Sequence, residues 1–336
     1  MKRILAAAAA AALCAGLFAG CGKADDGLDK VRVCEVTHSV FYAPQYAALA
    51  LGFFEEEGIE VELSNPVMAD KVMSAVLSDS VEIGLAGPES CVYVYNEGKA
   101  DGATVFAQLT QRDGSFLVAR EPDENFEWTD LAGKHVLPGR KGGVPYMAFE
   151  YAVKKAGLDP AADLLLDTSI QFDNMTGAFL GGTGDYVTVF EPTASSLEAE
   201  GKGYIVAAVG DMAGEIPYTA YFSQESRIEE NSGPVHRLQS FANAVAKGEA
   251  WVAQHTAEEV AAAVAEYFAD TDEELLAKAI QSYQDVGAYC TTPVMKQESF
   301  DLLQTVMSEA GELEEKAPFD AVVDNSYAEQ AAKAAG

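Results

Sequence analysis

The sequence predicts an α/β protein of two lobes, each built around a mostly parallel sheet. Short apolar segments rich in β-branched residues alternate with helical segments from Lys30 to about Arg120, and a second alternation begins after the segment FEWTDLAGK. Strands that alternate with helices form parallel sheets covered on both faces. The length of 336 residues exceeds what one compact core holds, which favours two lobes.

The order of the segments predicts how the chain passes between the lobes. Strands are expected at VRVCEVT, IEVELS, VEIGLA and ATVFAQLT, after which SFLVARE leads out of the first lobe. Further strands are expected at HVLPG, LLLDTSIQF, DYVTVFE and GYIVAAVGD, and YTAYFSQ returns the chain. A helical tail, with capping-box spacing at SRIE, TAEE and TDEE, then covers the first sheet. We therefore expect lobe 1 at residues 30–120 and 218–336, and lobe 2 at residues 121–217.

The start of the chain is typical of an exported protein. The basic residues of MKR precede an apolar run that ends in LFAGC and is shorter than the roughly 20 residues of a membrane-spanning helix. This pattern resembles the signal of bacterial lipoproteins, which implies a signal peptide at residues 1–20, lipid on Cys21 and anchoring to the cell membrane. An ordinary secretory signal is the alternative, and both place the protein outside the cytoplasm. Residues 21–29 are short and polar, as a tether is.

Charge and cysteine content limit the partners and cofactors. The net charge of −31 repels phosphate backbones, so we expect no nucleic-acid partner and interpret the acidic residues as a solvated surface. Beyond the leader and Cys21, the cysteines are Cys34, Cys91 and Cys290, an odd number without close spacing. No pair of cysteines or histidines has the spacing of a metal site. We expect a monomer with no metal, no cofactor and no structural disulfide.

Four segments in a fixed order carry a resemblance to a known family. They are YAPQYAALALGFFEEEGIEVEL, VEIGLAGPE, LAGKHVLPGRKGG and DYVTVFEPTAS. Together they resemble the solute receptors of bacterial ABC importers, in the family that binds sulfonates, taurine, nitrate or thiamine-pyrimidine precursors. The resemblance covers nearly the whole mature chain. It implies a type II periplasmic-binding-protein fold, a small-molecule ligand between the lobes, and the subunits of a membrane permease as partners.

The loop after the first strand offers the first group of ligand contacts. Ligands of open parallel sheets bind beyond the carboxyl ends of the strands. In the family that this sequence resembles, the loop at this position lines the ligand cleft, which implies that His38, Ser39, Phe41 and Tyr42 contact the ligand. The two rings could stack on a planar ligand and Ser39 could form a hydrogen bond with it. Alternatively, one or both rings fill the core beneath the loop.

A second loop, AGPES, follows the third strand and starts a helix. Pro88 is explained by its place at the first turn of a helix. Gly87 would let the backbone approach a ligand, and free amides around Glu89 and Ser90 could bind a hydrogen-bond acceptor. We therefore include Gly87, Glu89 and Ser90 in the predicted site.

The third loop, PGRKGGVPYM, precedes the long helix of the second lobe. Gly142 and Gly143 would expose amides at a helix N-terminus, which favours an anionic group. In sulfonate-binding relatives this loop binds the acid group of the ligand, and Arg140 and Lys141 could strengthen such binding. The alternative is a glycine turn with two solvated cations. The glycines lack the fixed spacing of a phosphate loop, so no nucleotide site is predicted.

The fourth segment, DYVTVFEPTAS, ends a strand at Phe190 and Glu191. A carboxylate at such a place is costly to desolvate without a donor, so Glu191 could receive a ligand amine or the edge of an aminopyrimidine. The alternative is a surface glutamate before a turn. Asp185 and Tyr186 have weaker claims to the site.

The residues predict a receptor and not an enzyme, with no catalytic residues. No acid/base pair with suitable spacing is present. A planar nitrogen-containing ligand, like a thiamine-pyrimidine precursor, is favoured over a sulfonate, taurine or nitrate. Two alternatives remain. The first is a ligand-sensing lipoprotein with the same fold. The second is a pyrimidine synthase like the fungal enzyme of this fold, although the CCCFC-type motif of that enzyme is absent here.

Overall fold

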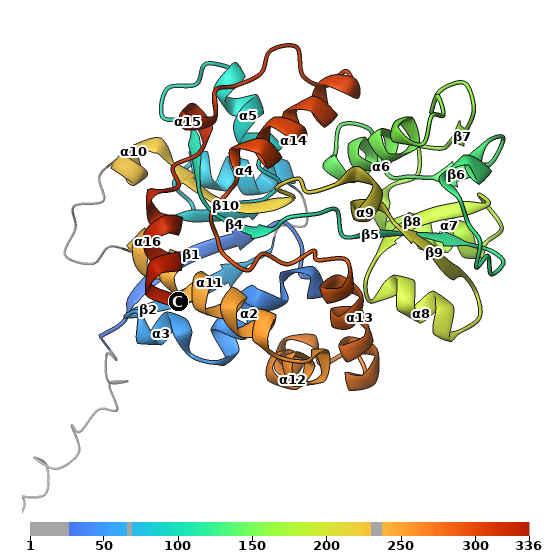
Figure 1. The fold of residues 1–336 in the computed structure, drawn as a ribbon. Helices are drawn as coiled ribbons and strands as arrows, with labels where there is room; N and C mark the ends of the chain where they lie inside the picture. Colours follow the sequence, from blue (N-terminus) through green and yellow to red (C-terminus); the bar gives the residue numbers. More distant parts are fainter. Residues whose placement is uncertain (1–26, 66–68, 230–236, 336) are drawn as a thin grey trace, which may run out of the picture.

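The computed structural model describes residues 27–65, 69–229 and 237–335 (Figure 1). The predicted signal peptide and the lipidation site at Cys21 lie outside these residues. Within them the chain forms two five-stranded sheets with helices around each.

The first sheet has the strand order β2-β1-β3-β10-β4. Its members are β1 (Asp29–Glu35), β2 (Ile59–Ser64), β3 (Ile83–Ala86), β4 (Ala103–Thr110) and β10 (Thr219–Gln224). β1 pairs in parallel with β2 and β3, whereas β10 runs antiparallel to both of its neighbours. The apolar residues of β3 are all buried, as expected for a central strand covered on both faces.

The second sheet repeats this arrangement in the order β7-β6-β8-β5-β9. Its members are β5 (Ser115–Ala119), β6 (His135–Leu137), β7 (Leu165–Leu166), β8 (Tyr186–Phe190) and β9 (Tyr204–Ala208). β6 pairs in parallel with β7 and β8, and β5 runs antiparallel to β8 and β9. The strand expected over LLLDTSIQF is thus reduced to two residues at the edge of the sheet.

Two segments cross between the sheets. Residues 111–114 lead from β4 in the first sheet to β5 in the second, and residues 209–218 lead back from β9 to β10. The expected first lobe extended to residue 120, but β5 forms its ladders with β8 and β9 and belongs to the second sheet. The crossing therefore occurs before Ser115, at residues that include the dipeptide Asp113–Gly114.

The helices of the first lobe cover both faces of its sheet (Figure 1). One face carries α2 (Ala43–Ala50), α3 (Phe53–Glu56), α11 (Arg237–Gln254) and α16 (Ser326–Ala335). The other carries α4 (Ala69–Leu77), α5 (Glu89–Asn96) and α15 (Phe319–Val322). The remaining elements of this lobe are η1 (Val40–Tyr42), α10 (Glu225–Glu229), α12 (Ala257–Val264) and η3 (Ala265–Phe268).

The second lobe has its own helices, and two helices of the tail reach it. Its own are η2 (Trp128–Leu131), α6 (Val144–Lys155), α7 (Phe172–Leu180), α8 (Thr193–Ala199) and α9 (Val209–Ala213). From the tail, α13 (Glu273–Asp285) contacts α8 and α14 (Gln297–Glu309) contacts α6 (Figure 1). The tail is therefore also part of the contact between the lobes.

A ring cluster ties the tail to the first sheet. Phe241 of α11 is fully buried, and its ring centroid lies 4.9 Å from that of Tyr221, 5.1 Å from that of Phe54 and 6.2 Å from that of Phe106. Truncating one such ring to alanine costs about 3–5 kcal/mol. This packing supports the prediction that the tail covers the existing first sheet.

The predicted helix caps are met in part. Thr256 and Glu259 form the expected capping box at the start of α12. At TDEE the cap is Asp272, one residue later than expected, because its carboxylate accepts the N–H groups of Glu274 and Leu275. At SRIE the helix α10 already begins at Glu225, so Ser226 is not its cap.

Candidate ligand site at the junction of the lobes

Four aromatic side chains, which we call the junction cluster, meet where the two lobes join. They are Phe41 of η1, Phe190 at the end of β8, Tyr218 just before β10 and Tyr283 of α13. The ring centroid of Phe41 lies 5.8 Å from that of Phe190, 5.5 Å from that of Tyr218 and 5.0 Å from that of Tyr283. Both lobes and a crossing segment therefore contribute to one apolar contact.

The loop after β1 holds Phe41 in this place. Ser39 is the N-cap of η1, and its hydroxyl accepts the N–H of Phe41 at 3.2 Å. Phe41 and Tyr42 are both buried, at 2% exposure each. In this conformation both rings therefore pack in the core beneath the loop, which was the alternative to ligand contact. Gly114 lies against Phe41, because a Cβ at this glycine would come within 2.6 Å of the ring. A larger residue in the crossing segment would displace Phe41.

The loop after β3 places Glu89 at the start of α5, almost fully buried. A Cβ at Gly87 would meet Oε2 of Glu89 at 1.9 Å, so the carboxyl group lies directly over this glycine. Oε2 has no hydrogen-bond partner among the described residues, and burial raises the pKa of Glu89 to about 7. Ser90 donates its hydroxyl hydrogen to the carbonyl of Gly87 at 2.7 Å and thereby closes the turn.

Asp113, which the sequence interpretation missed, lies in the first crossing segment and is 1% exposed. Its Oδ1 accepts the backbone N–H and the hydroxyl of Ser115, and burial raises its pKa to about 7. The Tyr218 hydroxyl lies near Asp113 and interacts with its charge, but no hydrogen bond of good geometry joins them. Within the described part of the chain, neither Oδ2 of Asp113 nor the hydroxyl of Tyr218 has a hydrogen-bond partner.

Glu191 occupies a different environment from the one predicted. It is 3% exposed, and its two carboxylate oxygens accept the N–H and the hydroxyl of Ser195 at 2.9 and 2.8 Å. Its own N–H donates to the Tyr283 hydroxyl at 3.0 Å. The carboxylate thus caps α8, because the first amides of a helix lack partners within the helix. Glu191 is neither a surface glutamate nor a free acceptor in this conformation.

The structure does not bring His38 to the junction cluster. Its Nδ1 lies 2.7 Å from the Tyr46 hydroxyl and its Nε2 lies 2.7 Å from the carbonyl oxygen of Tyr267. Its ring stacks on that of Phe268 at 4.8 Å. The same Tyr46 hydroxyl donates to Glu35, a buried carboxylate that needs donors. His38 therefore belongs to a polar network between α2 and η3.

The glycine loop of the second lobe lies beside an acid. Gly143 is the N-cap of α6, as predicted, and Gly142 has a φ of +82°. A Cβ at Gly142 would lie 3.8 Å from Oε2 of Glu312, while Arg140 and Lys141 are exposed. A carboxylate at this distance disfavours a bound anion. The alternative of a turn with two solvated cations fits this geometry better.

Asp185 and Tyr186 lie at the far end of their strand. β8 runs from Tyr186 to Phe190, and only Phe190 reaches the junction cluster. Oδ2 of Asp185 accepts the N–H of His135, and the Tyr186 ring contacts Phe126. The structure therefore adds no support for Asp185 or Tyr186 as ligand contacts.

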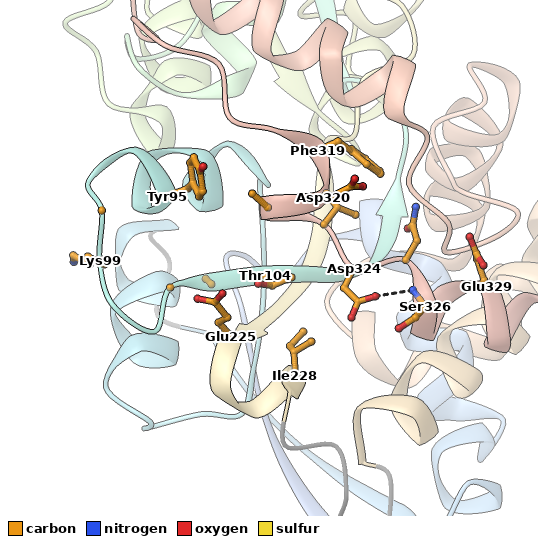
Figure 2. A pocket seen from close by; sticks show the side chains of 16 residues that line it. Tyr95, Lys99, Thr104, Glu225, Ile228, Phe319, Asp320, Asp324, Ser326 and Glu329 are labelled. Carbon is orange, nitrogen blue, oxygen red and sulfur yellow. Dashed lines mark hydrogen bonds between the residues drawn. The ribbon is translucent and has the colours of Figure 1, made fainter.

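Two surface hollows lie away from the junction cluster. The first, of about 810 Å³, is bordered by the start of β4 and by α10, α15 and α16, and Figure 2 shows carboxylates of Glu225, Asp324 and Glu329 around it. This hollow lies at the opposite end of β4 from Thr110, the last residue of that strand. The second, of about 640 Å³, lies beside α6 and β7 and includes Lys141 and Glu312.

Metal sites and membrane spans are not found in residues 27–65, 69–229 and 237–335. No group of three or more His, Cys, Asp or Glu side chains in these ranges could hold a metal ion. No helix there has the length and apolar character needed to cross a bilayer. Cys34, Cys91 and Cys290 are buried, free thiols.

Known proteins share this sequence and this fold. YtlA of Bacillus subtilis (strain 168), named for an inferred role in binding, is 41% identical over 308 residues, which cover 92% of this chain and 91% of YtlA. The ligand-binding component of an ABC-type import system from Staphylococcus aureus has a TM-score of 0.70 at 12% identity, covering 90% of this chain and 99% of that one. The periplasmic aliphatic sulphonate-binding protein SsuA of Escherichia coli has a TM-score of 0.67 at 15% identity, covering 87% and 96%.

These likenesses and the two five-stranded sheets confirm the predicted periplasmic-binding-protein fold. The family model described as "NMT1/THI5 like" matches residues 40–259, more than half of the chain. The match contains η1, the loop after β3, both crossing segments and the end of β8. The chain therefore belongs to the NMT1/THI5-like family.

Proposed function

We propose that this protein is the solute receptor of an ABC importer and binds one small organic molecule at the junction of its lobes. The junction cluster carries the proposal, because Phe41 comes from the first lobe, Phe190 from the second and Tyr218 from the crossing segment. A ligand stabilises a closed state only by its differential affinity for that state, so contacts from both lobes are required. This cluster offers such contacts.

Delivery to a permease is part of the proposal. The similar Staphylococcus aureus protein is the ligand-binding component of an ABC-type import system. We propose that lipid on Cys21 holds the receptor outside the cytoplasm, beside its permease. Changing Cys21 to alanine should release the protein from the membrane fraction or leave its leader uncleaved. Membrane association with normal cleavage in the Cys21→Ala variant would argue for another anchor.

For the ligand we favour a planar nitrogen-containing molecule, like a thiamine-pyrimidine precursor. Phe41 and Phe190 offer ring faces, and the unpaired oxygens of Glu89 and Asp113 offer acceptors for N–H groups. Glu191 remains a candidate acceptor, although it would first have to release Ser195. A sulfonate, taurine or nitrate is the second candidate, supported by the likeness to SsuA. Glu312, beside the loop at the start of α6, opposes an anion there.

We propose capture without turnover. A ligand-sensing lipoprotein would have the same fold and site, and would differ in the protein that docks on it. A pyrimidine synthase would change its ligand chemically. Binding therefore has to be measured together with the chemical identity of what is bound.

The test is recovery of the bound solute. The purified protein is incubated with a metabolite extract and desalted, and the retained small molecules are released and identified by mass spectrometry. We expect one unaltered solute, and at least tenfold less of it with Phe190→Leu. Phe241→Leu, which alters a buried ring in the first lobe away from the junction cluster, is the matched control and should retain the solute. A chemically altered solute would favour the enzyme, and no retained solute would contradict the proposal.

A further inference from the structure

Three polar groups at the junction of the lobes are buried without partners. In the described residues, buried side-chain oxygens that lack a hydrogen bond include Oε2 of Glu89, Oδ2 of Asp113 and the hydroxyl of Tyr218. All three residues are more than nine-tenths buried, at 8%, 1% and 6% exposure. A buried polar group without a partner costs free energy, so native structures rarely retain one without a reason.

These three groups share one neighbourhood. Burial raises the pKa of Tyr218 well above its ordinary value, and the charges of Asp113 and Glu89 raise it further. Burial and the charges of Glu35 and Glu89 act in the same way on Tyr42, beside Phe41. Tyr218 is also a member of the junction cluster, with its ring 5.5 Å from Phe41. Both acids therefore act on a ring of the junction cluster, and Gly114, the neighbour of Asp113, lies against Phe41.

No positive charge of the described protein balances the two acids. Burial raises the pKa of Glu89 and Asp113. The groups that oppose this rise are the Glu89 backbone, Ser115 and the nearby Tyr218 hydroxyl, not a lysine, arginine or histidine. Arg112, next to Asp113 in the sequence, lies 3.5 Å from Asp211 instead. Two buried carboxyl groups without a cation are costly to ionise. A positively charged ligand would supply the missing partner.

We propose that Glu89 and Asp113 recognise a positively charged nitrogen solute, such as an amidinium or a protonated amino-heterocycle, by accepting its N–H hydrogen bonds. This inference rests on the proposed function, and it specifies the charge of the ligand at the same site. The faces of Phe41 and Phe190 add a favourable contact, because aromatic faces attract cations. A sulfonate or nitrate would instead face two acids and no cation.

The proposal makes binding depend on pH in one direction. Glu89 is surrounded by Tyr42, Cys91, Tyr93 and Tyr218, all of which stay neutral at neutral pH because burial raises their pKa values. Asp113 faces Ser115, Tyr218 and Tyr283, which are likewise neutral. The acids alone therefore titrate near neutral pH. A cation binds their charged forms, so its affinity should fall as the pH is lowered through about 7.

The test compares three probes that share one ring and differ in charge: benzamidine, benzamide and benzenesulfonate. Isothermal titration at about pH 8 should give the tightest binding for benzamidine, a permanent cation in this range. Glu89→Gln and Asp113→Asn should each weaken benzamidine by about ten- to a hundredfold, the effect of one charge-assisted hydrogen bond. Glu249→Gln is the matched control, because Glu249 is also buried and unpartnered but lies in α11, where its charge acts on Tyr221 and Cys290.

Several results would overturn the proposal. Tighter binding of benzenesulfonate than of benzamidine would do so, as would equal loss of benzamidine binding in all three variants. Binding of benzamidine that strengthens as the pH falls would contradict the role of the two acids. If none of the three probes binds while the solute from the metabolite extract is retained, the cation is wrong and the receptor function stands. If that solute is also absent, the receptor function fails as well.

Discussion

In each lobe a glutamate next to a proline follows a central strand, but the two carboxyl groups have opposite environments. After β3 the order is Pro88–Glu89, and Glu89 is the first residue of α5. After β8 the order is Glu191–Pro192, and Glu191 precedes α8 by two residues. Glu191 reaches the free amide and the hydroxyl of Ser195, whereas Oε2 of Glu89 lies over Gly87 with no partner.

The difference shows that the order of the glutamate and the proline determines where the carboxylate lies relative to the start of the helix. A carboxylate just before a helix satisfies the unpaired amides at its start and stabilises the fold. The same carboxylate one position inside the helix, folded back over a glycine, keeps an oxygen free at a cost in stability. Groups that bind ligands often carry such a cost. In this structure Glu191 stabilises the start of α8, whereas the free oxygen of Glu89 is the one that we propose for recognition. The following experiments test this division.

The largest expected effect is a gain in stability from Glu89→Gln. Burial raises the pKa of Glu89 from 4.5 to about 7, so the folded state binds its proton more tightly than the unfolded state does. That stabilising contribution is complete below about 4.5 and is lost as the pH rises through about 7. The glutamine cannot ionise, so the variant should have a free energy of unfolding about 3 kcal/mol higher at alkaline pH.

Urea unfolding of the ligand-free protein at about pH 8 and about pH 5 measures this gain. The difference between variant and wild type should shrink strongly at the lower pH, where Glu89 is already protonated. Glu191→Gln is the control, because the wild-type carboxylate there is stabilised by Ser195 and the variant should gain nothing at either pH. A Glu89→Gln difference that is the same at both pH values would show that Glu89 does not ionise in the folded state.

The next largest effect is a loss of stability from Glu191→Ala. The change leaves the N–H and the hydroxyl of Ser195 unpaired in a site that is 0% exposed. Leaving buried donors unsatisfied should lower the free energy of unfolding by about 2 kcal/mol. Glu200→Ala, at an exposed position at the end of the same helix, should change it by less than about 0.5 kcal/mol. If Glu191→Ala and Glu200→Ala lowered the free energy of unfolding equally, the role of Glu191 as the cap of α8 would be wrong.

Much of the fold could be predicted because the strands carry their own pattern. Four of the five strands of the first sheet were expected from short apolar runs, and β10 was expected to return the chain to that sheet. The sequence could not predict which of the two sheets β5 joins, because the apolar segment SFLVA would suit a buried strand in either one. That choice is made by long-range ladders with β8 and β9, which no local pattern encodes.

Loops of the predicted site meet at the junction of the lobes, but not all of its predicted side chains do. The loops after β1, β3 and β8 could be found because ligands bind beyond the carboxyl ends of parallel strands. Asp113 and Tyr218 were missed because they lie in crossing segments, whose closeness to these loops depends on how the sheets are placed. The QRDGS segment held the one available signal, an acid beside a glycine between two strands. His38 was included from its position alone, and Glu35 and Tyr46 hold it elsewhere.

The smallest effect concerns the outer surface of the helix that Glu191 caps. Lys278 of α13 lies 2.8 Å from Glu198 of α8, with side-chain exposures of 46% and 36%. Exposed pairs of this kind contribute about 0.2–1 kcal/mol, and salt screens them. Lys278→Ala should therefore lower the free energy of unfolding by less than about 1 kcal/mol at about 0.05 M salt, and by close to zero at about 0.5 M.

Lys202→Ala, which removes an exposed pair with Glu200 inside the second lobe, is the matched control for a pair that does not join the lobes. Urea unfolding at both salt concentrations measures the two variants. If the loss for Lys278→Ala exceeded that for Glu191→Ala and persisted in high salt, the contact of α8 with α13 would matter more to the second lobe than the buried cap does.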